Sequence, residues 1–125
     1  MKRIAWAFLP VMAYAGLIVF LSSRSDPLPF LPPAFFLHDK LLHATEYAVL
    51  GGLLVHALRF AGVRPRPALI ASVVLASAFG ATDEFHQSFV PGRSADVADW
   101  AADTLGAAVG ASLATAFLRR PRRAG

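Results

Sequence analysis

Three stretches of the sequence place ionisable or strongly polar side chains at the spacing of a single helix face. The residues concerned are His43, Glu46 and Tyr47, then Asp83, His86 and Gln87, then Asp96, Asp99 and Asp103. Side chains three, four or seven positions apart lie on the same side of an α-helix. Carboxylates and imidazoles gathered in this way can transfer protons or hold a metal cation. If the three faces meet, the sequence predicts one polar pocket.

Each member of this predicted pocket has an expected role. The candidates for proton transfer are His86, Glu46 and Asp83. The candidate ligands of a divalent cation are Asp83, Asp99 and Asp103. The candidates for contact with a ligand are Arg93, His43, Tyr47, Gln87 and Lys40. Oxygen-rich sets suit Mg²⁺, Ca²⁺ or Mn²⁺, added histidine admits zinc, and the planar fork of arginine suits a phosphate or carboxylate.

Several polar residues also have a purely structural interpretation. Asp96 could cap the helix that follows it. His56 is interpreted as a hydrogen-bonded packing residue rather than a ligand, and Glu84 as a residue that faces water. His38 and Asp39 are expected in an interfacial loop.

The elements that carry these residues are predicted to be membrane helices. The 125 residues are 56% hydrophobic and 16% charged, whereas soluble chains have about 25% charged residues. Apolar segments predict four transmembrane spans in one domain of residues 1–125, at about 4–21, 43–59, 68–87 and 97–118. The fold class is therefore an all-α, four-helix transmembrane bundle. The chain has no cysteine, which excludes thiolate catalysis and a zinc site with cysteine ligands.

The first apolar segment has an alternative interpretation as a signal peptide. Lys2 and Arg3 precede it, and residues 13–15 resemble a cleavage site. The apolar run continues to Leu21, which favours a retained helix.

Basic residues predict the orientation of the bundle. Nine of them fall at the two chain ends and in the loop between the second and third spans, against three in the other loops. Short cytoplasmic loops carry the excess of Lys and Arg, so both termini are expected to be cytoplasmic. This distribution around apolar segments also explains the net charge of +4 without a nucleic-acid partner.

All eight acidic residues fall on the opposite side, in outer loops or outer helix ends. Acidic residues contribute little to topology, so their segregation indicates a site that faces outward. The outer loop at 22–40 carries four prolines among apolar residues and is expected to lie at the membrane interface, either as a roof over the site or as a linker resting on lipid. Gly106 and Gly110 form a GxxxG pair, which is interpreted as a helix contact.

The polar residues also carry a family resemblance. The motif consists of Asp39-Lys40 with His43 and Tyr47, the block DEFHQSFVPGR at 83–93, and Asp99, Asp103 and Gly106. In these features nearly the whole chain strongly resembles the VanZ-like family of small integral membrane proteins, in which an asparagine is frequent where this chain has Asp103. The family name comes from resistance to glycopeptide antibiotics, which bind cell-wall precursors. The resemblance implies a location in the bacterial cytoplasmic membrane and supplies no reaction.

Three functions therefore compete. The pocket could bind a cell-envelope or lipid-linked anionic ligand, such as a cell-wall precursor, without changing it. It could instead be the active site of a metal-assisted hydrolase or transferase that acts on such a ligand. Intramembrane carboxylates are also typical of ion or proton movement, but the inner halves of the spans lack the acidic groups that a continuous pathway needs.

Overall fold

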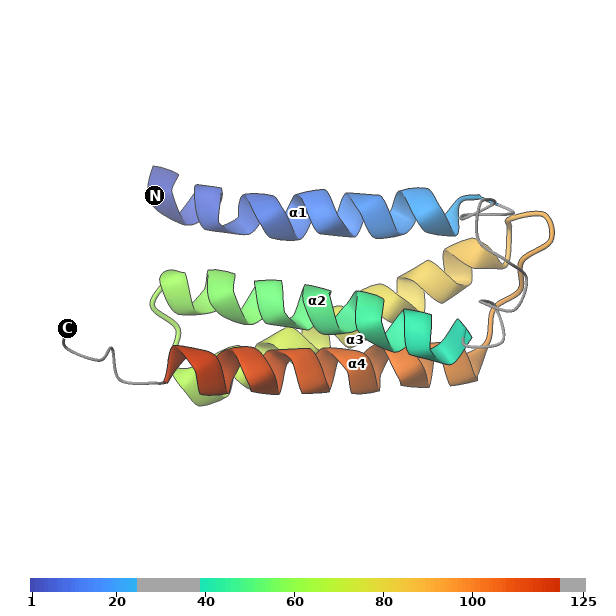
Figure 1. Cartoon of the computed structure of the whole chain (residues 1–125). Coiled ribbons are helices and arrows are strands. Elements are labelled where there is room, and N and C mark those ends of the chain that lie inside the picture. Colours follow the sequence, from blue (N-terminus) through green and yellow to red (C-terminus); the bar gives the residue numbers. More distant parts are fainter. Residues whose placement is uncertain (25–38, 120–125) are drawn as a thin grey trace.

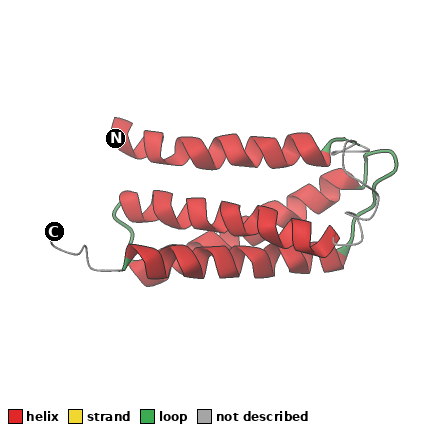
Figure 2. Ribbon diagram, in the orientation of Figure 1, coloured by secondary structure: helices red, strands yellow, loops and turns green. Residues whose placement is uncertain are grey.

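The computed structural model describes residues 1–24 and 39–119, and this part of the chain forms four α-helices (Figure 1). The helices are α1 (Lys2–Ser22), α2 (Asp39–Phe60), α3 (Pro65–Gln87) and α4 (Val97–Leu118). Helices and short connections account for all of the described residues (Figure 2). Each helix is long and apolar enough to cross a membrane, so the predicted all-α, four-helix class is confirmed.

The helix boundaries differ from the predicted spans mainly at two N-termini. Helix α4 covers the predicted span, whereas α2 begins at Asp39 and α3 at Pro65. Pro65 and Pro67 precede the predicted third span, but they lie in the first turn of α3. A proline in the first turn of a helix is tolerated because the N–H groups there have no intrahelical partner. The earlier start of α2 places Lys40 on the helix that carries His43.

The four helices run alternately up and down, so α1 begins and α4 ends at the same end of the bundle (Figure 1). The N-termini of α2 and α4 lie at the other end, together with the C-termini of α1 and α3. This arrangement agrees with an even number of spans. Residues 25–38, which include most of the predicted interfacial loop and His38, lie outside the described residues.

Large apolar side chains cover much of the outside of the bundle. Examples on α1, α3 and α4 are Trp6, Leu9, Met12, Ile70, Val74, Leu105, Val109 and Leu113. A monomeric soluble protein rarely exposes so extensive an apolar surface. The arrangement fits a bundle that is surrounded by lipid.

Small residues allow the backbones of α2 and α4 to meet. A Cβ atom on Gly106 would lie 2.1 Å from the carbonyl oxygen of Ala44, and one on Gly110 would lie 1.9 Å from that of Ala48. Side chains cannot occupy such positions, so both glycines are required for this approach. The interpretation of the GxxxG pair as a helix contact is confirmed.

Helix α1 packs more lightly against the other three. Val11 and Ile18 point inward, and the hydroxyl of Tyr14 donates a hydrogen bond to the backbone carbonyl of Glu46 at 2.8 Å. These contacts hold α1 beside the half of α2 that carries the polar residues.

Gly110→Ala is expected to destabilise the bundle. The added methyl group would force the backbones of α2 and α4 apart, and overpacking of this kind costs on the order of 1–3 kcal/mol. The measurement is the unfolding of purified protein in detergent. Gly16→Ala is the matched control, because a Cβ there meets no described atom within 4 Å. Equal stability of the two variants would contradict the close contact.

Single cysteines at Ser88 and Ala124 test the predicted orientation. In the topology with cytoplasmic termini, a membrane-impermeant thiol reagent added to intact cells should label the Ser88 site and spare the Ala124 site. Ser88 is exposed at the end of α3 opposite the N-terminus of the chain. The chain has no cysteine of its own, so there is no background labelling. Labelling of the Ala124 site alone would reverse the orientation.

Candidate functional site

The polar end of the bundle is formed by the N-termini of α2 and α4 and the C-terminus of α3. Six side chains there are buried although they are ionisable or strongly polar: His43, Asp83, Glu84, Gln87, Asp99 and Asp103. Ionisable groups inside a membrane bundle are costly and mark functional sites by default. This end therefore contains the candidate site.

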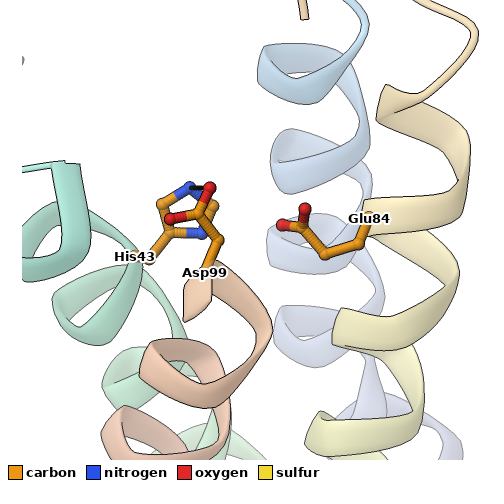
Figure 3. Close-up of side chains that lie close together, drawn as sticks. All are labelled: His43, Glu84 and Asp99. Carbon is orange, nitrogen blue, oxygen red and sulfur yellow. Dashed lines mark ion pairs between the residues drawn. The ribbon is translucent and has the colours of Figure 1, made fainter. Parts of the chain in front are cut away.

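His43, Glu84 and Asp99 come from three different helices and converge (Figure 3). One potential ligand atom from each residue lies within 4.8 Å of the other two. In Figure 3 the imidazole of His43 and the carboxylate of Asp99 lie against each other, and the carboxylate of Glu84 points toward them from α3. Two carboxylates and one imidazole fit a divalent cation such as Mn²⁺ or Zn²⁺.

A fourth residue orients the histidine. Nδ1 of His43 lies 2.7 Å from Oδ1 of Asp103, which is fully buried. With Asp103 ionised, its carboxylate can only accept hydrogen bonds, so Nδ1 would be the donor, and in a neutral ring the lone pair would then be on Nε2. Nε2 in turn lies 3.8 Å from Oδ2 of Asp99. A histidine that binds metal through one nitrogen commonly donates the other N–H to a carboxylate in this way.

Lys40 and Asp96 complete the rim of the site. Lys40 Nζ contacts Oδ1 of Asp99 and lies 3.1 Å from Oδ2 of Asp96. Asp96 also accepts from the backbone N–H of Ala98, which confirms its predicted role as the cap of α4. The hydrogen bond from Lys40, followed by the one from Ala98, holds the pKa of the Asp96 carboxyl below its usual value. The backbone N–H of Asp96 donates to Oε2 of Glu84 at 2.9 Å.

Four buried polar atoms of the described residues have no hydrogen-bond partner. They are the Tyr47 hydroxyl oxygen, Asp83 Oδ1, Glu84 Oε1 and Asp103 Oδ2. An unsatisfied buried polar group costs about 1–3 kcal/mol, so such groups are rare in native proteins unless water, an ion or a ligand satisfies them. All four belong to residues of the three helices that form this end.

The predicted metal ligands are only partly brought together. Asp99 belongs to the group of three potential ligands. Asp103 does not belong to it and instead contacts Nδ1 of His43. Asp83 is buried on another side of α3, where the amide of Gln87 lies 3.5 Å from its Oδ2 and 3.4 Å from the hydroxyl of Ser22 on α1.

The interpretation of Glu84 as a residue that faces water is wrong. Glu84 is buried and contributes to the group with His43 and Asp99. Helix α3 is contacted on one side by α1 and on another by α4, so consecutive carboxylates on it are both enclosed. The sequence contains one indication that Glu84 is buried, because Glu84 falls inside the predicted span, where contact with water is restricted.

Two other candidates for the pocket lie nearer to the end of α1. His86 is exposed, and its Nε2 lies 2.9 Å from the hydroxyl of Ser23. Nη1 of Arg93 donates to the backbone carbonyl of Arg24 at 3.0 Å.

The interpretation of His56 as a packing residue is wrong, because its side chain is exposed on α2 toward the opposite end of the bundle.

Glu46 and Tyr47 lie one turn further along α2 than His43. Glu46 is partly buried, and Tyr47 is fully buried beside Gly80 and Asp103, where a Cβ on Gly80 would lie 3.3 Å from its ring and 3.2 Å from Oδ2 of Asp103. The catalytic and ligand-binding roles of these residues stay predictions.

Comparison with known proteins identifies the family. No curated protein and no solved structure matches the chain. The family model described as VanZ/LLP1 matches residues 7–119, a range that includes every residue of the site. The resemblance seen in the DEFHQSFVPGR block is therefore confirmed, and this multi-pass membrane protein belongs to the VanZ/LLP1 family.

Proposed function

We propose that the polar end of the bundle binds an anionic group of a cell-envelope or lipid-linked ligand, and that a divalent cation held by His43, Glu84 and Asp99 mediates the contact. The observation that carries the proposal is the convergence of these three side chains within 4.8 Å from three helices. The site is proposed to face the outer side of the bacterial cytoplasmic membrane, in keeping with the distribution of basic residues.

The charge of the site supports a cation. Carboxylates outnumber the nearby fixed cations, Lys40 and Arg93, and three of the carboxylates have an oxygen without a hydrogen-bond partner. Buried like charges repel one another unless a cation or protons compensate. A divalent cation at His43, Glu84 and Asp99 would neutralise two of these charges and engage the free oxygen of Glu84.

The same cation would allow an acidic pocket to bind an anion. A metal held by three protein ligands keeps coordination positions open for water or a ligand. Without the metal, the carboxylates would repel a phosphate or carboxylate group. The proposal therefore makes ligand binding dependent on the metal.

The surroundings of the site favour a ligand that is attached to the membrane. Phe85, Phe89 and Val97 are exposed on the segments next to the site, and Trp100 lies on the first turns of α4 with its indole N–H donated to the carbonyl of Ser77 at 2.9 Å. Tryptophan is enriched at the membrane–water interface, because its amphipathic ring is favoured at the level of the headgroups. A lipid-linked cell-wall precursor has the required anionic group, and such a ligand would connect the site with the antibiotic resistance after which the family is named.

A metal-assisted hydrolase or transferase is the second candidate. The specific observation in its favour is the buried carboxylate of Asp83, whose Oδ1 has no partner and could accept a proton from a nucleophile. His86 and Glu46 are the other proton-transfer candidates.

Purified protein should bind Mn²⁺, and His43→Gln should weaken the binding by at least about tenfold, because the change removes the ligand nitrogen and its link to Asp103. The measurement is isothermal titration in detergent. His56→Gln is the matched control on the same helix and should bind like the wild type. Glu84→Gln and Asp99→Asn should also weaken binding, whereas Asp103→Asn should have a smaller effect, since an amide oxygen still accepts from Nδ1. Equal affinities of the His43→Gln and His56→Gln variants would refute the centre.

The two candidate functions differ in turnover. We expect the wild type to bind lipid-linked pyrophosphates in the presence of Mn²⁺ and to release them unchanged. Product formation, followed by chromatography, would favour the enzyme instead. In that case Asp83→Asn or His86→Gln should lower the rate by about 10²–10⁴ while Mn²⁺ binding persists, and the variant that does so identifies the proton-transfer group.

A further inference from the structure

Asp99 lies between the ammonium of Lys40 and the proposed cation centre. Its Oδ1 contacts the ammonium of Lys40, and its Oδ2 faces Nε2 of His43 in the proposed cation centre. Lys40 also reaches Asp96, at 3.1 Å. The ammonium of Lys40 and a cation bound at Asp99 would therefore be neighbours that use the same carboxylate.

The two positions lie at different depths. The side chain of Lys40 is 51% exposed, whereas those of Asp99 and His43 are only about one-tenth exposed, at 10% and 11%. The ammonium thus lies at the mouth of the site and the proposed cation lies beneath it. An anion bound between the two positions would have to contact the exposed ammonium and the more deeply placed cation.

Electrostatics predicts how these two charges affect each other. A divalent cation at Asp99 would repel the ammonium and compete with it for the carboxylate. An anion with several oxygens could relieve this repulsion by placing one oxygen on the metal and another on the ammonium. Phosphate groups commonly complete the coordination of carboxylate-bound divalent cations, and lysine binds phosphate as a point charge.

We propose that the anionic group bound at this site is a phosphate or pyrophosphate, held between Lys40 and the cation, so that Lys40 couples the binding of the two. The inference rests on the proposed function, in which His43, Glu84 and Asp99 hold the cation. It adds the chemical class of the ligand and a role for Lys40. Without the anion, Lys40 opposes the cation. With the anion bound, Lys40 stabilises the complex.

One unpartnered atom of the site supports the cation on which this inference rests. Oε1 of Glu84 has no hydrogen-bond partner although Glu84 is only 6% exposed, and it belongs to the residue that faces His43 and Asp99. On the rim, Leu41 follows Lys40 and is 64% exposed, and Val97 at the start of α4 is 77% exposed. An apolar rim of this kind would favour a phosphate that is carried by a lipid.

The test compares Mn²⁺ and anion binding in the wild type, Lys40→Met, Lys40→Arg and the control Lys2→Met, which changes the other lysine at the opposite end of the bundle. The probes are Mn²⁺ alone, inorganic pyrophosphate with saturating Mn²⁺, and nanodiscs that contain phosphatidic acid or only phosphatidylcholine. Titration calorimetry and the electron paramagnetic resonance signal of free Mn²⁺ give the affinities.

In the wild type and in Lys2→Met, pyrophosphate should raise the affinity for Mn²⁺ by about 5–150-fold, the usual range of coupling between two sites. In Lys40→Met, Mn²⁺ alone should bind several-fold more tightly. The factor by which pyrophosphate raises the affinity for Mn²⁺ (the coupling) should fall close to one in this variant. Lys40→Arg should keep most of the coupling. Stronger coupling with phosphatidic acid nanodiscs than with pyrophosphate would identify a lipid phosphate as the source. The reverse order would identify a soluble phosphate.

The negative outcomes separate the two proposals. Coupling that is equal in the wild type and Lys40→Met, with Mn²⁺ bound by both, would overturn the role of Lys40 and leave the cation centre intact. Weaker Mn²⁺ binding by Lys40→Met in the absence of an anion would also overturn it. A wild type that binds no Mn²⁺ would overturn both the cation centre and the inference.

Discussion

The candidate site depends on the close approach of α2 and α4 at Gly106 and Gly110. Gly106 faces the backbone of Ala44, which is the neighbour of His43, and Asp103 lies one helical turn before Gly106. Contact between the backbones thus fixes the register that places Asp103 2.7 Å from the imidazole of His43. Because side chains are absent at the contact, this register has little freedom to shift. A packing motif without any chemistry of its own therefore sets the geometry of the polar residues.

The burial of the carboxylates is the second constraint. Lipid offers no hydrogen bonds, so each polar group in the bundle must find a partner within the protein or from a bound group. Several of these groups do so: Asp103 pairs with His43, and Glu84 accepts from the backbone of Asp96. Among the carboxylate oxygens that have no hydrogen-bond partner, Oε1 of Glu84 belongs to the group that the proposed cation would occupy. In this interpretation the bundle gives up stability at one end in order to keep a site there.

The sequence alone predicts the properties that are local to each helix, and it fails where the outcome depends on how helices rotate against one another. The length and apolar composition of each helix and the GxxxG pair can be recognised within single segments, and the structure confirms the four helices and the helix contact predicted from them. Asp83 and Glu84 are consecutive, about 100° apart around a helix of 3.6 residues per turn. Only the packing of α3 between α1 and α4 shows that Asp83 faces Ser22 and Gln87 while Glu84 faces Asp99. The pairing of His43 with Asp103 is hidden for the same reason, since it joins residues 60 positions apart.

Asp96 connects the three helices that meet at the site, although it is not a candidate metal ligand. Its carboxylate caps α4 and accepts from Lys40 of α2, and its backbone N–H donates to Glu84 of α3. The cap therefore joins the same three helices that supply His43, Glu84 and Asp99. Any ligand that binds these three residues in the folded protein, and not in the unfolded chain, stabilises the folded state. The contacts that assemble this end of the bundle therefore also assemble the site. A bound ligand would stabilise the same end of the bundle that the buried carboxylates destabilise.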